Sequence, residues 1–209
     1  MKEEHPPRES AERGGSTLRS ELGRKAIHAL GIVLPLGYVA FGEARGREMI
    51  LALTAAVLAA DAFRLASPLA RHVYRTTFLG RLSRPWEEHR PTGASLFMIG
   101  QALAVLVFPA SVAPAAMTFA ILGDAAAAVA GRSIGGPRWW PDKTLAGSIA
   151  FALVSFLAGL AWGLLPWYVV LAGALVAAVV EGLSGRAADN IAVPLAGGFV
   201  MWALLGLGR

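Results

Sequence analysis

The sequence predicts an all-α membrane protein with about seven transmembrane helices and a cytoplasmic N-terminus. Three observations support this fold class. Of the 209 residues, 56% are hydrophobic and 16% are charged, with a mean hydropathy of +0.55. At about 20 apolar residues per spanning helix, the chain after its polar start has room for about seven such helices. Lys and Arg are concentrated in alternate loops between the apolar runs, as they are in membrane proteins with basic cytoplasmic loops.

The chain begins with a polar segment. Residues 1–25 carry many charges together with Pro6, Pro7, Gly14 and Gly15, and they lack the apolar run that a secretory signal peptide needs. We therefore expect residues 1–25 to be a disordered cytoplasmic tail. Residues 26–209 are expected to form a single transmembrane helical domain.

Seven apolar segments follow, and proline or glycine interrupts the chain between several of them. They comprise residues 27–42, 48–66, 93–110, 112–131, 145–165, 166–184 and 190–207. If each of them crosses the bilayer, 16 of the 19 Lys and Arg residues lie on one side and three on the other. Because cytoplasmic loops hold the excess of positive charge, the N-terminus is predicted inside and the C-terminus outside.

The stretch between the second and third segments, residues 67–90, mixes hydrophobic side chains with five arginines. Four of its five arginines, Arg71, Arg75, Arg81 and Arg84, alternate with aromatic or aliphatic residues, a pattern typical of an amphipathic segment that lies on the inner leaflet. A solvated loop whose arginines extend toward water fits the same pattern equally well. Within it, Glu87 and Glu88 could assist at a site, but we interpret them as a solvated acidic pair.

Composition also excludes several kinds of chemistry. The chain has no cysteine, which excludes disulfides, thiolate catalysis and cysteine-ligated metal centres. Its net charge of +5 is explained by membrane topology and anionic lipid headgroups, so no nucleic-acid partner is expected. No feature of the sequence indicates an oligomeric state.

Ionisable residues within the apolar segments are the candidates for function, because each costs free energy in a membrane unless it is paired or used. Asp61 lies three residues before Arg64 and is expected to form a structural ion pair with it. Asp124 has no basic residue within a helical turn, which favours a functional carboxylate. Glu181 ends the sixth segment, and Asp189 precedes the seventh, where it could simply cap a helix.

The predicted topology places all of these groups near the cytoplasmic ends of their helices. We therefore expect one site at the cytoplasmic membrane surface. Its members are Arg24, Lys25, His28, Asp61, Asp124, Lys143, Glu181 and Asp189.

The segment from Gly123 to Ser148 combines glycines and basic residues between two apolar segments. Bare backbone N–H groups, a helix N-terminus, a lysine and a hydroxyl together suit a phosphate group. A polyphosphate brings Mg²⁺, for which Asp124 is the leading ligand and Glu181 or Asp189 the next. The segment lacks the GxxxxGK[ST] loop, and as a physical pattern it fits an ordinary glycine-rich connector equally well.

The same segment resembles the CTP-binding signature of the dolichol kinase, phytol kinase and CTP-dependent diacylglycerol kinase family. The resemblance is carried by Asp124, Ala127, Gly131, Gly135, Lys143-Thr144 and Gly147. Three further stretches resemble that family in the same order along residues 21–200, namely ELGRKAIHALG, RPTGASLFMIG and VEGLSGRAADNIAVPL. One position departs from the family pattern, because Ala146 stands where a glutamate is usual.

This resemblance implies a multi-pass cell-membrane enzyme whose active site faces the cytoplasm. It would transfer the γ-phosphate of CTP, with Mg²⁺, to the hydroxyl of a lipid alcohol such as phytol, a polyprenol or diacylglycerol. The implied catalytic residues are Asp124, Lys143, Glu181 and Asp189, of which Asp124, Glu181 and Asp189 would also bind the metal. The implied nucleotide-binding residues are Asp124, Ala127, Gly131, Arg132, Gly135, Lys143, Thr144, Gly147 and Ser148. Arg24, Lys25, His28 and Asn190 would contact a phosphate or a headgroup.

Two other functions remain open from the sequence. The phosphatidate cytidylyltransferase family has a similar Asp, Gly-Arg, Gly and Lys-Thr-x-Gly run, but its later Ser, Lys-Arg, Lys-Asp and His-Gly-Gly series is missing here after Gly147. A small transporter or a structural membrane protein would also be rich in glycine. The two halves of this chain show no obvious repeat, which disfavours a transporter.

Overall fold

The computed structural model describes residues 18–141, 143–185 and 188–207. The chain is mostly helical, as predicted. In chain order, its elements are α1 (Leu18–Leu30), α2 (Val33–Phe41), α3 (Glu43–Ala66), α4 (Pro68–Thr76), α5 (Phe78–Leu82), the 3₁₀ helix η2 (Pro85–His89), α6 (Gly93–Val107), α7 (Ala113–Thr118), the π-helix η3 (Phe119–Gly123), α8 (Asp124–Ser133), β1 (Arg138–Trp140), β2 (Lys143–Thr144), α9 (Leu145–Ala161), α10 (Trp167–Leu183) and α11 (Asp189–Leu207).

Four stretches of helix are long and apolar enough to cross a membrane. They are Gly23–Phe41, Glu43–Ala66, Ala113–Ser133 and Asp189–Leu207, with 19 to 24 residues each. Three shorter apolar helices coincide with the other predicted segments: Gly93–Val107, Leu145–Ala161 and Trp167–Leu183. The mostly helical fold is therefore confirmed, and four of its helical stretches are candidate membrane spans by length and composition.

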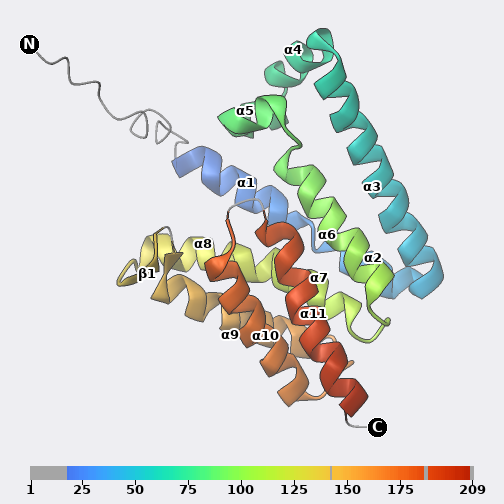
Figure 1. Cartoon of the computed structure of the whole chain (residues 1–209), viewed down its shortest axis with the longest axis vertical. Helices are drawn as coiled ribbons and strands as arrows, with labels where there is room; N and C mark the ends of the chain where they lie inside the picture. Colours follow the sequence, from blue (N-terminus) through green and yellow to red (C-terminus); the bar gives the residue numbers. More distant parts are fainter. Residues whose placement is uncertain (1–17, 142, 186–187, 208–209) are drawn as a thin grey trace, which may run out of the picture.

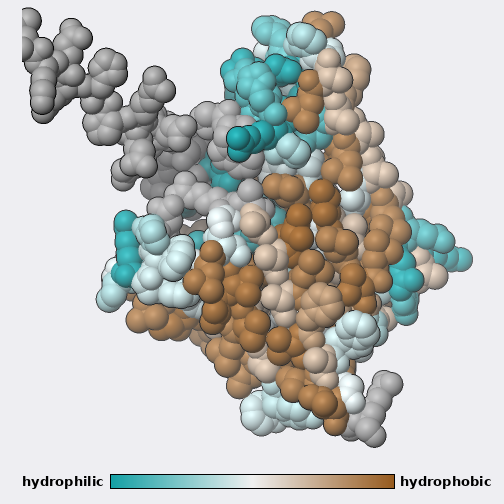
Figure 2. All heavy atoms as spheres, viewed as in Figure 1, coloured by the Kyte–Doolittle hydropathy of each residue, from teal (hydrophilic) through white to brown (hydrophobic). Residues whose placement is uncertain are grey.

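The outer surface of the helices is apolar. Large side chains such as Leu30, Phe63 and Leu153 are more than half exposed. Figure 2 shows hydrophobic residues over most of the helical body, whereas hydrophilic residues gather around α4 and α5 and around β1. A soluble protein rarely exposes so much contiguous apolar surface, so this surface fits a lipid environment.

The helices pack side by side in an order that differs from their order in the chain. Across Figure 1 the order is α3, α6, α11, α10 and α9, and each of them packs against the next. Small residues bring α10 and α11 together: a Cβ placed on Gly173 would lie 3.1 Å from the carbonyl oxygen of Gly197. Every residue of α7 is buried, because α2, α6, α9 and α11 all contact it. The continuous helical stretch Ala113–Ser133, which carries Asp124, therefore begins with a fully buried turn.

The structure corrects the sequence predictions at the N-terminal tail. Residues 1–17 of the predicted disordered tail lie outside the described residues, but residues 18–25 are helical as the start of α1. Tertiary contacts account for this helix. The Arg24 guanidinium donates to the Leu82 carbonyl oxygen at 2.8 Å, and Lys25 forms an ion pair with Asp124.

A second correction concerns the expected glycine-rich connector. Part of it forms the antiparallel strands β1 and β2, with Arg138 opposite Thr144 and Trp140 opposite Lys143. Gly135 and Gly136 precede β1 with φ of 66° and 97°, a conformation that favours glycine. The protein is therefore not purely helical, and the short hairpin fixes where Lys143 and Thr144 lie.

The predicted ion pair between Asp61 and Arg64 is confirmed, with a separation of 2.7 Å between buried side chains. The Arg64 guanidinium also donates to the carbonyl oxygens of Glu87, Glu88 and Arg90 at 2.8–3.2 Å. Asp61 accepts hydrogen bonds from the main-chain N–H of Thr92 at 2.8 Å and from the Ser95 hydroxyl at 2.7 Å. This network anchors the chain between α5 and α6 to the end of α3.

Candidate functional site

One pocket of about 810 Å³ brings together residues from nearly the whole length of the chain. Fourteen of the fifteen residues predicted to act in catalysis or binding line it. They are Arg24, Lys25, His28, Asp124, Ala127, Gly131, Arg132, Lys143, Thr144, Gly147, Ser148, Glu181, Asp189 and Asn190.

Two residues expected at this site lie elsewhere. Gly135 does not line the pocket: it lies in the turn before β1, and no described atom is within 4 Å of a Cβ placed on it. Its expected nucleotide contact stays a prediction, and its positive φ serves the turn. Asp61 does not line the pocket either, because its carboxylate is taken up by Arg64, Thr92 and Ser95.

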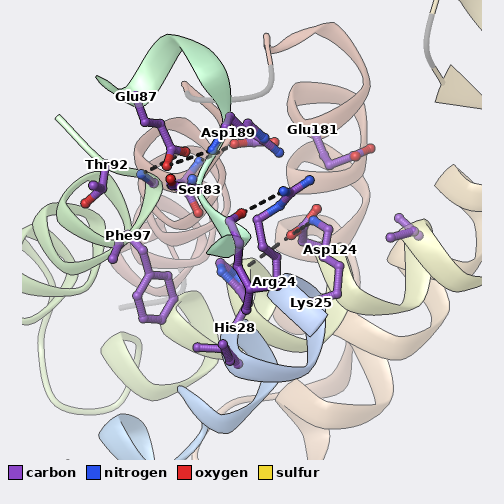
Figure 3. A pocket seen from close by; sticks show the side chains of 18 of the residues that line it. Arg24, Lys25, His28, Ser83, Glu87, Thr92, Phe97, Asp124, Glu181 and Asp189 are labelled. Atoms are coloured by element: carbon purple, nitrogen blue, oxygen red, sulfur yellow. Dashed lines mark hydrogen bonds and ion pairs between the residues drawn. The ribbon is translucent and has the colours of Figure 1, made fainter. Parts of the chain in front are cut away.

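Asp124 lies at the point where the buried π-helix η3 passes into α8. A π-helical turn widens the helix, and such turns are frequent at functional sites. Its carboxylate forms an ion pair with Lys25 of α1, and the His28 ring nitrogen Nε2 lies 3.8 Å from the same oxygen. His28 is held by a hydrogen bond from Nε2 to the carbonyl oxygen of Ala120 at 2.8 Å. Figure 3 shows Lys25 and Asp124 facing each other in the pocket.

Lys143 and Glu181 form a second ion pair, between the β hairpin and the end of α10. The Glu181 side chain is 3% exposed and that of Lys143 is 18% exposed, so the lysine lies on the pocket side of the pair. Burial of an unpaired carboxylate in a membrane helix would cost several kcal/mol, and the lysine removes that cost. The pair also holds the ammonium group of Lys143 at the pocket.

Asp189 lies beside Asp124 at the start of α11. The two carboxylates line one narrow crevice, together with Asn190. The main-chain N–H of Asn190 donates to Asp189 Oδ1 at 2.8 Å. A close contact fixes this helix end, because Gly100 of α6 leaves no room for a side chain against the Asn190 carbonyl oxygen. Asp189 thus serves the helix start and also lines the pocket.

The carboxylates of Asp124, Glu181 and Asp189 are the expected ligands of the implied Mg²⁺. Within the described residues, no three His, Asp or Glu side chains are grouped closely enough to hold a metal, so the expected trio of Asp124, Glu181 and Asp189 does not form a metal site by itself. Mg²⁺ in nucleotide sites, however, uses one or two carboxylates, the phosphates and water. Asp124 and Asp189 fit that lesser requirement, and the ammonium group of Lys25 already occupies the Asp124 carboxylate as a cation would.

The glycines of the predicted signature bring two helices together. A Cβ on Gly147 would lie 3.0 Å from the Ala127 carbonyl oxygen, and one on Gly131 would lie 2.9 Å from Thr144 Oγ1. Thr144 caps α9 by accepting a hydrogen bond from the Gly147 N–H at 3.1 Å. These residues therefore set the approach of α8 to α9, and this packing role is visible without any ligand.

The β hairpin is fixed to the helices by Trp139. Its indole N–H donates to the Ser148 hydroxyl at 3.0 Å. Gly182 of α10 lies against the indole ring and has no room for a Cβ there. The hairpin thereby brings Arg138 and Lys143 to the pocket, which the exposed Arg132 also lines.

Residues between α4 and α6 form a wall of the pocket that the sequence did not reveal. They are Tyr74, Leu79, Leu82, Ser83, Arg84, Glu87, Thr92 and Gly93. The interpretation of Glu87 as a solvated acid is wrong, because Glu87 is 6% exposed, whereas Glu88 does pair at the surface with Arg75 at 2.9 Å. The missed signal was Thr92 followed by an apolar helix, which marks a cap and therefore an ordered approach to α6.

Tyr74 and Glu87 are neighbours in this wall. Burial, followed by the negative charge of the Glu87 carboxylate, raises the pKa of the Tyr74 phenol. The Arg64 guanidinium lies 5.3 Å from the centre of the Tyr74 ring. The part of the wall from Glu87 to Thr92 is therefore ordered on the Asp61–Arg64 network, whereas α4 and α5 are surface helices with no buried residue.

The pocket combines six Lys and Arg side chains with four carboxylates. Its polar residues come mainly from α1, α8, α10, α11 and the hairpin. An apolar part is formed by residues of α1, α3, α5 and α6, such as Ile27, Val57, Leu82 and Phe97. Such an arrangement can bind a polyanion at one side and an alkyl chain at the other.

No family model, curated protein or solved structure matches this chain.

Proposed function

We propose that this protein is a CTP-dependent kinase that phosphorylates a membrane lipid alcohol. The observation that carries the proposal is the pocket itself. Residues that the sequence associated with a nucleotide-phosphate site, spread from Arg24 to Asn190, line one cavity that also has an apolar side. A volume of about 810 Å³ is within the range of small-molecule sites. The choice of CTP derives from the resemblance of the 124–147 run to CTP-using kinases.

The polar part of the pocket suits the triphosphate. Lys143, Arg132 and the start of α9 would hold phosphate oxygens, because a helix N-terminus and basic side chains attract anions. Mg²⁺, held by Asp124 and Asp189, would neutralise charge on the phosphates. Glu181 would keep Lys143 in place, which is a positioning role. Phosphoryl transfer depends mainly on such positioning and charge neutralisation.

The apolar part suits the acceptor. Phe97, Met98 and Val57 line the pocket on helices whose outer surfaces are also apolar. A lipid alcohol would reach the phosphates from the bilayer without crossing water. Phytol, a polyprenol and diacylglycerol all present a hydroxyl at the end of a hydrophobic body, so the apolar part of the pocket alone does not select among them.

We also propose that all seven apolar segments cross the membrane with the N-terminus in the cytoplasm. The pocket lies at the beginning of the first, third, fifth and seventh segments and toward the end of the fourth and sixth, whereas the second contributes Val57 from its middle. This alternation is what successive antiparallel crossings produce. The helices α6, α9 and α10 have 15 to 17 residues, and a locally thinner bilayer would accommodate them.

The test uses purified protein in liposomes with γ-labelled CTP and a panel of phytol, farnesol, a long polyprenol and diacylglycerol. We expect label in the lipid extract for at least one alcohol, and release of CDP. Release of pyrophosphate with formation of a CDP-lipid would identify a cytidylyltransferase instead. Absence of nucleotide binding, together with solute flux, would favour a transporter.

A further inference from the structure

The wall of residues 74–93 contains a carboxylate, that of Glu87, which lines the pocket but has no role in the function proposed so far. Glu87 is buried, lines the pocket and is fixed from three directions. Its carboxylate oxygens accept hydrogen bonds from the main-chain N–H groups of Arg84 at 3.3 Å and Gly93 at 3.4 Å. Its own carbonyl oxygen accepts a bond from the buried Arg64 guanidinium at 3.0 Å.

The position of Glu87 differs from that of the other acids. Figure 3 shows Glu87, Ser83 and Thr92 on one side of the pocket and Glu181 on the other, with Asp124 nearer to Glu181. Asp124 and Glu181 are each bound to a lysine. Glu87 instead belongs to the wall that continues into the apolar side chains of Leu79, Leu82 and Met98.

A carboxylate at this place can accept a proton. Each carboxylate has about four acceptor positions, and the two main-chain N–H groups occupy two of them. An acceptor whose hydrophobic chain lies along the apolar wall would bring its hydroxyl to the boundary between that wall and the polar part. The buried surroundings strengthen a hydrogen bond from that hydroxyl to the carboxylate.

We propose that Glu87 is the catalytic residue that binds the acceptor hydroxyl and removes its proton. This inference rests on the proposed kinase function. The hydroxyl oxygen forms a bond to the terminal phosphorus, and the bond from that phosphorus to the oxygen of the departing CDP breaks. The hydroxyl proton passes to the Glu87 carboxylate, which later releases it to water. Glu87 would also supply a carboxylate in a chain that has Ala146 where the resembling family has glutamate.

The adjacent Glu88 offers a matched control, because it has the same side chain but lies at the surface in an ion pair with Arg75. Glu87→Gln and Glu88→Gln are compared in liposomes with γ-labelled CTP and the alcohol of the panel that the wild type phosphorylates fastest. We expect Glu87→Gln to lower kcat by about 10²-fold or more, the range of general base catalysis. We expect CTP binding to change by less than about 3-fold, and Glu88→Gln to retain the wild-type rate.

A conservative variant separates proton transfer from a structural role. Glu87→Asp keeps the carboxylate and should restore part of the rate that Glu87→Gln loses.

Three results would overturn the inference: an unchanged kcat in Glu87→Gln, an equal loss of CTP binding and kcat, or no recovery in Glu87→Asp beyond that of Glu87→Gln. A wild-type protein that transfers no phosphate from CTP would contradict the proposed function itself, which is a separate outcome.

Discussion

Lys25 and Lys143 each meet a carboxylate that lies far away in the sequence. Lys25 pairs with Asp124 across 99 positions, and Lys143 pairs with Glu181 across 38. Both carboxylates would be costly in a membrane protein without a cation. Under the proposed function, Lys25 can turn from Asp124 toward an entering phosphate, and the freed Asp124 can take a metal, while Lys143 stays paired with Glu181. The two carboxylates are thus each neutralised by a lysine before any ligand binds.

The first prediction concerns these pairs. Asp124→Asn and Lys143→Ala should each lower phosphate transfer by at least about 10²-fold, because each removes a charge that neutralises or positions the transferred group. Asp124→Asn should remain folded in the membrane, and Lys143→Ala should lose stability as well, because it leaves the buried Glu181 carboxylate without its cation. Transfer of label from γ-labelled CTP measures the effect. Glu48→Gln is the control, because Glu48 is exposed near the start of α3 and does not line the pocket. Full activity of either pocket variant would remove the pocket from consideration as the site of transfer.

The second prediction concerns the buried Asp61–Arg64 pair. Asp61→Ala leaves the Arg64 charge buried without its partner, so the free energy of unfolding should fall by about 3–5 kcal/mol. The exposed pair of Glu43 and Arg47 is the control, and Glu43→Ala should cost less than about 1 kcal/mol. Denaturant unfolding in detergent measures both. Equal losses in the two variants would contradict the anchoring role of Asp61.

At the scale of elements, the close approach of α8 to α9 shapes the polar side of the pocket. Gly131 and Gly147 face each other across this contact, with 3.6 Å between a Cβ on Gly147 and the Cα of Gly131. The sequence identified both glycines, but as nucleotide contacts. Only the structure shows that they hold the helices together, because the contact partners lie 16 residues apart on two elements.

The third prediction follows from this contact. Gly147→Ala places a Cβ 3.0 Å from the Ala127 carbonyl oxygen, a contact that the backbone can relieve only by moving the helices apart. We expect a loss of about 1–3 kcal/mol in stability and a weaker affinity for CTP. Thermal unfolding and nucleotide titration measure these effects. Gly206→Ala in α11, where a Cβ meets no described atom within 4 Å, should leave both unchanged or slightly increase stability. Equal behaviour of the two variants would argue against the contact.

The elements also show what the sequence can and cannot predict. Apolar periodicity and length located all the long helices, since these properties are local. The wall of residues 74–93 was missed, because alternating arginines and hydrophobic residues look the same on a solvated loop and on an ordered surface helix. Its order depends on Arg64, which donates to three carbonyl oxygens more than 20 residues away. The hairpin was missed for a similar reason, since Trp139 is fixed by Gly182, 43 positions later.

At the scale of the whole molecule, the proposed function depends on the topology. The fourth prediction uses the absence of cysteine, which allows single cysteines to be labelled without background. With an impermeant maleimide added outside cells, cysteines at Ala44, Ser111 and Leu164 should react. Cysteines at His89 and Ser133 should react only after the membrane is opened. Labelling of Leu164 and Ser133 from the same side would show that α9 does not cross the membrane.

The central claim is that the pocket transfers the terminal phosphate of CTP to a lipid hydroxyl. The most direct measurement compares γ-labelled with α-labelled CTP in parallel reactions of liposome-bound protein with the alcohol panel, followed by extraction of the lipids. We predict that γ label alone enters the lipid phase and that Asp124→Asn abolishes this transfer. Entry of the α label, or of neither label with any alcohol, would contradict the claim.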